Sequence, residues 1–305
     1  MIYSILKPLI RIALFFFCRK IFIQNKSAFN IKGPLLLTAN HPNSFFDAII
    51  IGAFFKQRVH FLARGDAFNK PYHRFLLSLL NMIPIYRLSE GKENLVNNNY
   101  AFAASKKILE NKGIVLIFIE GICLLTNQLQ PFKKGAARIA LDYQGQNALQ
   151  ILPIGIAYDR FNAWGKTVHV ALGNPILAKQ LLPFTDRAKN MNHFNTEIKH
   201  RLEQLIIVPS TAQTKKSKGL HLLAQVGILL HQPFFSLVQK QVKIKTNRTV
   251  FYDSVLFGSL FILYPVFLIL ISIIAYWFIG ISTYFILALF IISARTIVLY
   301  KNPAK

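Results

Sequence analysis

The longest uncharged stretch of the chain covers residues 254–294 and lies between Asp253 and Arg295. At a rise of about 1.5 Å per residue it would form roughly 60 Å of helix, twice the ~30 Å thickness of the hydrocarbon core of a bilayer. The pattern therefore predicts a transmembrane hairpin of two helices, with a turn within residues 276–282 and a kink at Pro265. The alternatives are a single re-entrant helix and a hairpin buried in a soluble core.

Basic residues flank this predicted hairpin on both sides. They are Lys243, Lys245, Arg248, Arg295, Lys301 and Lys305. Cytoplasmic segments beside membrane helices carry an excess of Lys and Arg, so both ends of the hairpin are expected in the cytoplasm. The pattern predicts a protein of the cytoplasmic (inner) membrane, with the residues that precede the hairpin on the cytoplasmic face.

The N-terminal residues 1–26 are apolar, but basic side chains interrupt them. These are Lys7, Arg11, Arg19, Lys20 and Lys26. Such a pattern is typical of a helix that lies on an anionic membrane surface, and we expect a membrane-interfacial helix within residues 1–30. A first spanning helix is an alternative. A secretory signal fits less well, because the uncharged run is short and no small-residue cleavage site follows it.

The middle of the chain alternates short aliphatic runs with amphipathic stretches. The runs predict strands at residues 34–38, 59–63, 83–86, 114–119, 150–157 and 167–172. The stretches predict helices at residues 44–55, 71–80, 92–111, 134–144 and 186–205. Strands separated by helices indicate an α/β fold with a mixed, largely parallel sheet flanked by helices.

Composition narrows the class of protein. The chain has 36 Lys and Arg against 12 Asp and Glu, and 53% of its residues are hydrophobic, which excludes a disordered protein. Cys18 and Cys123 are too few for a disulfide scaffold and form no CxxC pair for zinc, so a reducing compartment is expected. A formal charge of +24 indicates an acidic partner, either nucleic acid or the anionic surface of a membrane.

Residues 186–248 hold 11 of the basic residues and 3 acidic ones. Beside a membrane hairpin such a stretch can bind anionic headgroups, although a simple solvated surface has the same composition. Nucleic-acid binding would need basic and aromatic residues interleaved on a known module, and the sequence contains none. We therefore expect membrane lipids, and no nucleic acid, as partners.

Polar residues with catalytic potential follow the predicted strands. His41 comes directly after the first strand, and Asp47 lies in the next helix, where its carboxylate can face the imidazole and make it a better base. Arg87 ends another strand and can present its guanidinium to a phosphate. Glu120 and Gly121 end the strand at 114–119, and Gly121 allows a ligand to approach the backbone closely.

Two further cations, Lys133 and Lys134, open the helix predicted at 134–144. All these groups fall at strand ends, where α/β sheets bind their ligands. Four of these residues could instead have roles other than substrate binding. Arg87 could form a structural ion pair and Glu120 a helix cap or salt bridge, while Lys133 and Lys134 could simply attract membrane headgroups.

The motifs that contain these residues resemble those of the glycerolipid acyltransferase family, which includes the 1-acylglycerol-3-phosphate acyltransferases. The resemblance spans about residues 34–176 and rests on four blocks in the family's order. The family's blocks are Asn-His-x4-Asp, Gly-x-Ile-Pro-x-x-Arg, Phe-Pro-Glu-Gly-Thr-Arg-Ser and a Pro-containing apolar strand. They correspond here to Asn40-His41 with Asp47, and to residues 81–87, 118–123 and 151–156.

Two departures from the family pattern affect the expected site. Five residues, rather than four, separate His41 from Asp47, as in some glycerol-3-phosphate acyltransferases and bacterial relatives. The third block reads FIEGIC, so the Pro, Thr and Arg of the family are absent and Cys123 stands near the usual hydroxyl position. A phosphate ligand is therefore missing, and the expected substitutes are Lys133, Lys134, Arg87 and Arg64.

The resemblance implies transfer of a fatty acyl group from acyl-CoA or acyl carrier protein to a hydroxyl of a glycerol phosphate or lysophospholipid. His41 would act as general base and Asp47 would steady the imidazolium, while Glu120 and Gly121 would position the acceptor and Arg87 would bind its phosphate. No bound cofactor is implied, and no metal, because the sequence has no HExxH motif or carboxylate cluster. No GxSxG elbow indicates an acyl-enzyme, and a core thiol is favoured over a nucleophile for Cys123.

Two other functions remain open. Water could replace the acceptor, which would make the protein a lipid or thioester hydrolase. It could also be a catalytically inactive membrane protein that binds anionic lipid.

The expected domain organisation has four parts. They are the interfacial helix at 1–30, an acyltransferase α/β domain at 31–208, a basic linker and interfacial segment at 209–250, and the hairpin with its basic tail at 251–305. Within the third part, the aliphatic residues 219–241 fit either an interfacial helix or a wall of the acyl channel. The sequence offers no argument for one over the other.

Overall fold

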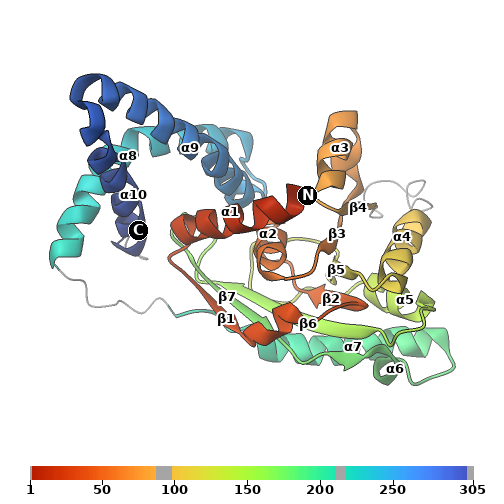
Figure 1. The fold of residues 1–305 in the computed structure, drawn as a ribbon. Coiled ribbons are helices and arrows are strands. Elements are labelled where there is room, and N and C mark those ends of the chain that lie inside the picture. Colours follow the sequence, from red (N-terminus) through yellow and green to blue (C-terminus); the bar gives the residue numbers. More distant parts are fainter. Residues whose placement is uncertain (1, 87–97, 211–217, 301–305) are drawn as a thin grey trace.

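The fold was analysed in a computed structural model, which describes residues 2–86, 98–210 and 218–300 (Figure 1). Its strands are β1 (Lys20–Gln24), β2 (Leu35–Ala39), β3 (Val59–Arg64), β4 (Met82–Ile85), β5 (Ile114–Phe118), β6 (Gln150–Tyr158), β7 (Thr167–Leu172) and β8 (Ile176–Leu177). Its α-helices are α1 (Ile2–Phe17), α2 (Phe45–Phe54), α3 (Pro71–Leu79), α4 (Asn98–Glu110), α5 (Gly135–Asp142), α6 (Ala178–Leu181), α7 (Arg187–Leu205), α8 (Lys218–Lys245), α9 (Tyr252–Ile279) and α10 (Thr283–Tyr300). Short 3₁₀ helices cover Lys26–Asn30, Gly65–Phe68 and Gly280–Ser282.

The strands form one sheet in the order β1-β7-β6-β2-β5-β3-β4, and β8 pairs with β6. Strands β2 to β6 run parallel to one another, whereas β7 and β8 run antiparallel to β6. The mixed, largely parallel sheet predicted from the sequence is therefore confirmed. Because the central strands are parallel, the carboxyl ends of β2, β5 and β3 meet at one edge.

The sheet is buried on both faces. In β2, Leu35 and Leu37 pack into the core beneath α1 and α2, whereas Leu36 packs into the core beneath α4, α5 and α7. All five residues of this strand are buried, as expected for a central strand with both faces covered. Figure 1 shows the resulting layers, with α1 and α2 on one face of the sheet and α7 on the other.

The N-terminal segment differs from its prediction. The helix expected within residues 1–30 ends at Phe17, and Lys20–Gln24 instead forms the edge strand β1, paired with β7. Its burial alternates between exposed and half-buried residues, so β1 belongs to the sheet and not to an interfacial helix. The other strands predicted from the sequence lie within two residues of their expected ends, while β8 was not predicted.

The apolar C-terminal residues form the predicted pair of helices, α9 and α10, joined by a 3₁₀ turn at Gly280–Ser282. The helix α9 continues through Pro265. Two stretches, Gly219–Lys245 and Tyr252–Tyr300, are long and apolar enough to cross a membrane, judged by length and composition alone. The aliphatic residues 219–241 belong to α8, which packs along α10 (Figure 1).

The first turn of α9 is fastened to the α/β domain by a buried charge pair. Lys166 donates to the Asp253 carboxylate, and both side chains are fully buried. The same carboxylate accepts the backbone N–H groups of Asn162 and Ala163, each at 3.0 Å. The loop before β7 and the start of the apolar hairpin therefore form one hydrogen-bonded unit.

Breaking this pair from one side is expected to be costly. Lys166→Met leaves the Asp253 carboxylate buried without its cation, and removal of one partner of a buried pair lowers the free energy of unfolding by about 3–5 kcal/mol. The matched control is Lys199→Met, which breaks an exposed pair with Glu203 on α7 and costs at most about 1 kcal/mol. Denaturant unfolding of the detergent-solubilised proteins measures both, and equal losses would contradict the role given to Lys166.

Candidate active site

The strand-to-helix corner after β2 brings a histidine and an aspartate together. His41 follows the end of β2, and Asp47 lies in the first turn of α2. The Nδ1 atom of His41 is 3.0 Å from Oδ2 of Asp47. The Asp47 side chain is fully buried, whereas 14% of the His41 side chain is exposed. One side of the imidazole therefore faces a buried carboxylate.

This contact sets the tautomer of the histidine. A carboxylate only accepts hydrogen bonds, so Nδ1 carries the proton and Nε2 keeps a lone pair. The ring stacks on Phe118, with 3.7 Å between ring centroids and 12° between the planes. Among the residues that the structure describes, none forms a hydrogen bond to Nε2. The site therefore presents a basic nitrogen of fixed orientation.

Asp47 is held by three donors. Besides His41, its Oδ2 accepts the backbone N–H of Asn43 at 2.8 Å, and its Oδ1 accepts the hydroxyl of Tyr158 at 2.6 Å. Burial and the nearby Asp47 carboxylate hold the pKa of Tyr158 well above 10.0, so the phenol stays protonated and donates. Tyr158 was not among the predicted site residues, because it lies at the end of β6, 111 positions from its partner Asp47.

The corner itself is tied to distant parts of the chain. The Asn40 side chain bonds both the N–H and the C=O of Ile156, at 2.8 and 2.9 Å, and so fixes the end of β2 against β6. Ser44 has a φ of 55°, and its N–H donates to Sγ of Cys123 at 3.0 Å. The two departures from the family pattern, the longer loop and the cysteine, thus meet in one contact.

Helix α2 receives part of its N-terminal capping from α9. Its cap residue Ser44 makes no side-chain capping bond, and Oγ of Ser254 accepts the N–H of Phe46 at 3.0 Å. The apolar hairpin therefore contacts the helix that carries Asp47. This bond was not predicted from the sequence, because no local pattern links positions that are 208 residues apart.

Glu120 and Gly121 lie directly beside the histidine. The Glu120 carboxylate accepts the N–H groups of His41 and Gln130, both at 3.2 Å. Gly121 has a φ of 64°, and a side chain there would come within 2.8 Å of Cγ of Lys133. The N–H of Lys133 bonds the carbonyl of Ile119 at 2.8 Å. The stem of Lys133 therefore crosses the glycine at the end of β5.

The other predicted cations are placed differently. Lys134 is exposed at the start of α5. Arg64 ends β3, at the same edge of the sheet as His41 and Glu120, and pairs with Asp66. Arg87 lies outside the described residues. Within the described residues, no group of three or more His, Cys, Asp or Glu side chains could hold a metal ion.

Comparison with known proteins finds a family and solved structures that resemble this chain. Residues 20–157 match the acyltransferase family. A solved structure, the 1-acyl-sn-glycerophosphate (LPA) acyltransferase PlsC from Thermotoga maritima, is similar at 18% sequence identity and a TM-score of 0.45, over 63% of this chain and 74% of that chain. No curated protein matches the chain.

Removal of the Tyr158 hydroxyl tests the network around Asp47. Tyr158→Phe leaves Oδ1 of a buried carboxylate without a donor, and hydrogen bonds to charged groups contribute about 1.5–3 kcal/mol to the free energy of unfolding. Tyr143→Phe is the matched control, because its hydroxyl bonds the Asn147 carbonyl at an exposed site. Chemical denaturation that finds the two variants equally stable would show that the bond to Asp47 contributes little.

Glu120 gives the stability a pH dependence. Burial raises its pKa from 4.5 to about 7, so the folded protein binds a proton that the unfolded chain releases near pH 4.5. The free energy of unfolding therefore falls as the pH rises from about 4.5 to 7. The Glu120→Gln side chain does not titrate, so the free energy of unfolding of this variant, relative to that of the wild type, should increase between about pH 4.5 and 7. Thermal unfolding at several pH values measures the difference, and a constant difference would contradict the raised pKa.

Proposed function

We propose that the protein transfers a fatty acyl group from a thioester to a hydroxyl of a glycerol phosphate or lysophospholipid, because residues 20–157 match the acyltransferase family. The donor thioester is acyl-CoA or acylated acyl carrier protein. The observation that carries the proposal is the fixed pair of His41 and Asp47 at the edge where the carboxyl ends of the strands meet, in which Nε2 forms no hydrogen bond with any other described residue.

In the proposed reaction, Nε2 of His41 takes the proton of the acceptor hydroxyl as its oxygen attacks the thioester carbonyl. Asp47 stabilises the imidazolium that forms, and Tyr158 keeps the carboxylate in place. When the carbon–sulfur bond breaks, the imidazolium returns the proton to the leaving thiolate. The products are an ester and a free thiol, so the histidine ends in its starting state.

The acceptor is expected to bind between the ends of β2 and β5. Gly121 lets it approach the backbone, and Lys133 brings a positive charge to its phosphate. The buried Asn43 side chain, which has no hydrogen-bond partner among the described residues, offers an amide to a polar group of the substrate. A hydrolase has no use for cations beside the base, so these charges favour transfer over hydrolysis.

The proposed location is the cytoplasmic face of a membrane. Two stretches of the C-terminal region have the length and composition of membrane helices, and α1 is apolar with exposed Leu9 and Ile12. The formal charge of +24 adds attraction to anionic headgroups. Since Ser254 of α9 bonds the helix that carries Asp47, this arrangement would put the base at the membrane surface, where lysolipid headgroups lie.

Substitution of the base tests the proposal. His41→Ala should lower kcat by a factor of about 10² or more, the usual contribution of general-base catalysis, while vesicle binding stays unchanged. His200→Ala on α7 is the control, because His200 is exposed and bonds only Gln204 of its own helix among the described residues.

Mass spectrometry of the products formed from both thioester donors, with glycerol 3-phosphate and several lysolipids as acceptors, gives the rates. Normal transfer by His41→Ala would refute the assigned base. Release of free fatty acid by the wild type, with no acylated acceptor, would indicate a hydrolase. A wild type that binds vesicles and forms neither product would be an inactive lipid-binding protein.

A further inference from the structure

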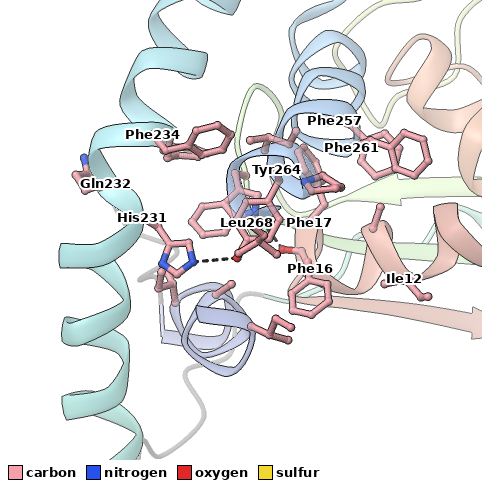
Figure 2. Close-up of a pocket in the computed structure, with 18 of the residues that line it drawn as sticks. Ile12, Phe16, Phe17, His231, Gln232, Phe234, Phe257, Phe261, Tyr264 and Leu268 are labelled. Carbon is pink, nitrogen blue, oxygen red and sulfur yellow. Dashed lines mark hydrogen bonds between the residues drawn. The ribbon is translucent and has the colours of Figure 1, made fainter. Parts of the chain in front are cut away.

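A large cavity lies among the apolar helices, outside the site around His41. It has a volume of about 660 Å³ and is lined by side chains of α1, α8, α9 and α10. Figure 2 shows Phe16 and Phe17 of α1 facing it, with Phe234 of α8 and Leu268 of α9. Its volume lies within the range of about 300–1,000 Å³ that is typical of sites for small molecules.

The lining excludes a charged ligand. None of the described residues around the cavity is Asp, Glu, Lys or Arg. His231 and Tyr264 are the main polar groups, and they satisfy each other: Nδ1 of His231 donates to the Gly227 carbonyl at 2.8 Å, and Nε2 accepts the Tyr264 hydroxyl at 3.0 Å (Figure 2). A phosphate or a polar carrier would lose its hydration here without compensation, whereas a hydrocarbon chain would not.

The cavity is open toward an apolar surface. Ile12 and Ile228 line it and are 58% and 47% exposed, and exposed aliphatic side chains continue along α9 at Ile262 and Ile269. In the membrane arrangement proposed above, these residues face lipid, so a chain would enter the cavity from the bilayer and not from water.

The inner end of the cavity lies near α2, the helix that carries Asp47. Phe17 and Phe257 line the cavity, and both rings pack against Phe46, with centroids 5.2 and 5.6 Å away. Phe46 directly precedes Asp47 and is fully buried. A chain in the cavity would therefore end one aromatic side chain, that of Phe46, away from Asp47 on α2.

We propose that this cavity binds the hydrocarbon chain of a lysophospholipid acceptor and thereby selects an acceptor that already resides in the bilayer. This inference rests on the proposed acyl transfer and narrows the acceptor to a lipid with a chain of its own. Glycerol 3-phosphate has no chain and would gain nothing from the cavity. The thioester donor approaches from water with its polar carrier, and its chain would not use this entrance.

Ala294 offers a direct test, because it lines the cavity from α10 and is 7% exposed. The Phe side chain of Ala294→Phe would occupy space that about two methylene groups of the lipid chain would otherwise fill. Loss of their burial should raise the KM for oleoyl lysophosphatidate about tenfold. The KM for the thioester donor should stay within about twofold of the wild-type value. Ala13→Phe fills the cavity from α1 and should act alike, while Ala288→Phe, exposed on α10, is the matched control and should change neither constant.

Trp164 provides a second readout that needs no turnover. It lines the cavity, and the only other tryptophan is Trp277, which is 83% exposed. In Trp277→Phe protein, lysophosphatidate with a brominated chain should quench the fluorescence of Trp164 saturably. Unbrominated lysophosphatidate should compete, glycerol 3-phosphate should not, and Ala294→Phe should weaken the apparent affinity about tenfold.

Three results would overturn the inference. They are efficient transfer to glycerol 3-phosphate with no transfer to lysolipids, a rise in the KM of the donor instead of the acceptor, and equal quenching in the Ala294→Phe and Ala288→Phe proteins. Saturable quenching without any acyl transfer would leave the lipid site in place and refute the proposed reaction instead.

Discussion

The arrangement of this protein depends on one buried carboxylate. Asp47 has no exposed surface, and its two oxygens accept bonds from His41, Asn43 and Tyr158. A buried charge is tolerated only when such partners surround it, so the loop after β2, the first turn of α2 and the end of β6 are held in one geometry. That geometry turns the lone pair of the histidine away from the carboxylate, and the proposed chemistry starts from it.

The same corner connects the α/β domain to the apolar hairpin. Ser254 and Asp253, in the first turn of α9, bond the start of α2 and the loop before β7. The hairpin is therefore part of the scaffold of the candidate site, in addition to any role as an anchor. For the proposed acyl transfer, this coupling would prevent the base and the apolar hairpin from moving independently.

Much of the sheet could be predicted because its central strands are short aliphatic runs buried on both faces, as in Leu35–Ala39 and Ile114–Phe118. The positions of His41 and Glu120 after two neighbouring strands, with Asp47 in the helix that follows His41, also indicated which groups would lie close together. The edge strand Lys20–Gln24 was missed because it follows an apolar basic helix after two residues and continues the same composition. Tyr158 and Ser254 were missed because their contacts depend on the folded topology, which no local pattern encodes.

The central claim is that Asp47 fixes His41 as the Nδ1–H tautomer, with the lone pair on Nε2. Nitrogen-15 NMR of histidine-labelled protein in micelles, with His41→Gln to assign the signal, measures this directly. The account predicts a protonated Nδ1 coupled to its hydrogen and an unprotonated Nε2 in the neutral ring. A proton on Nε2, with Nδ1 unprotonated, would contradict the pairing with Asp47 and remove the proposed base.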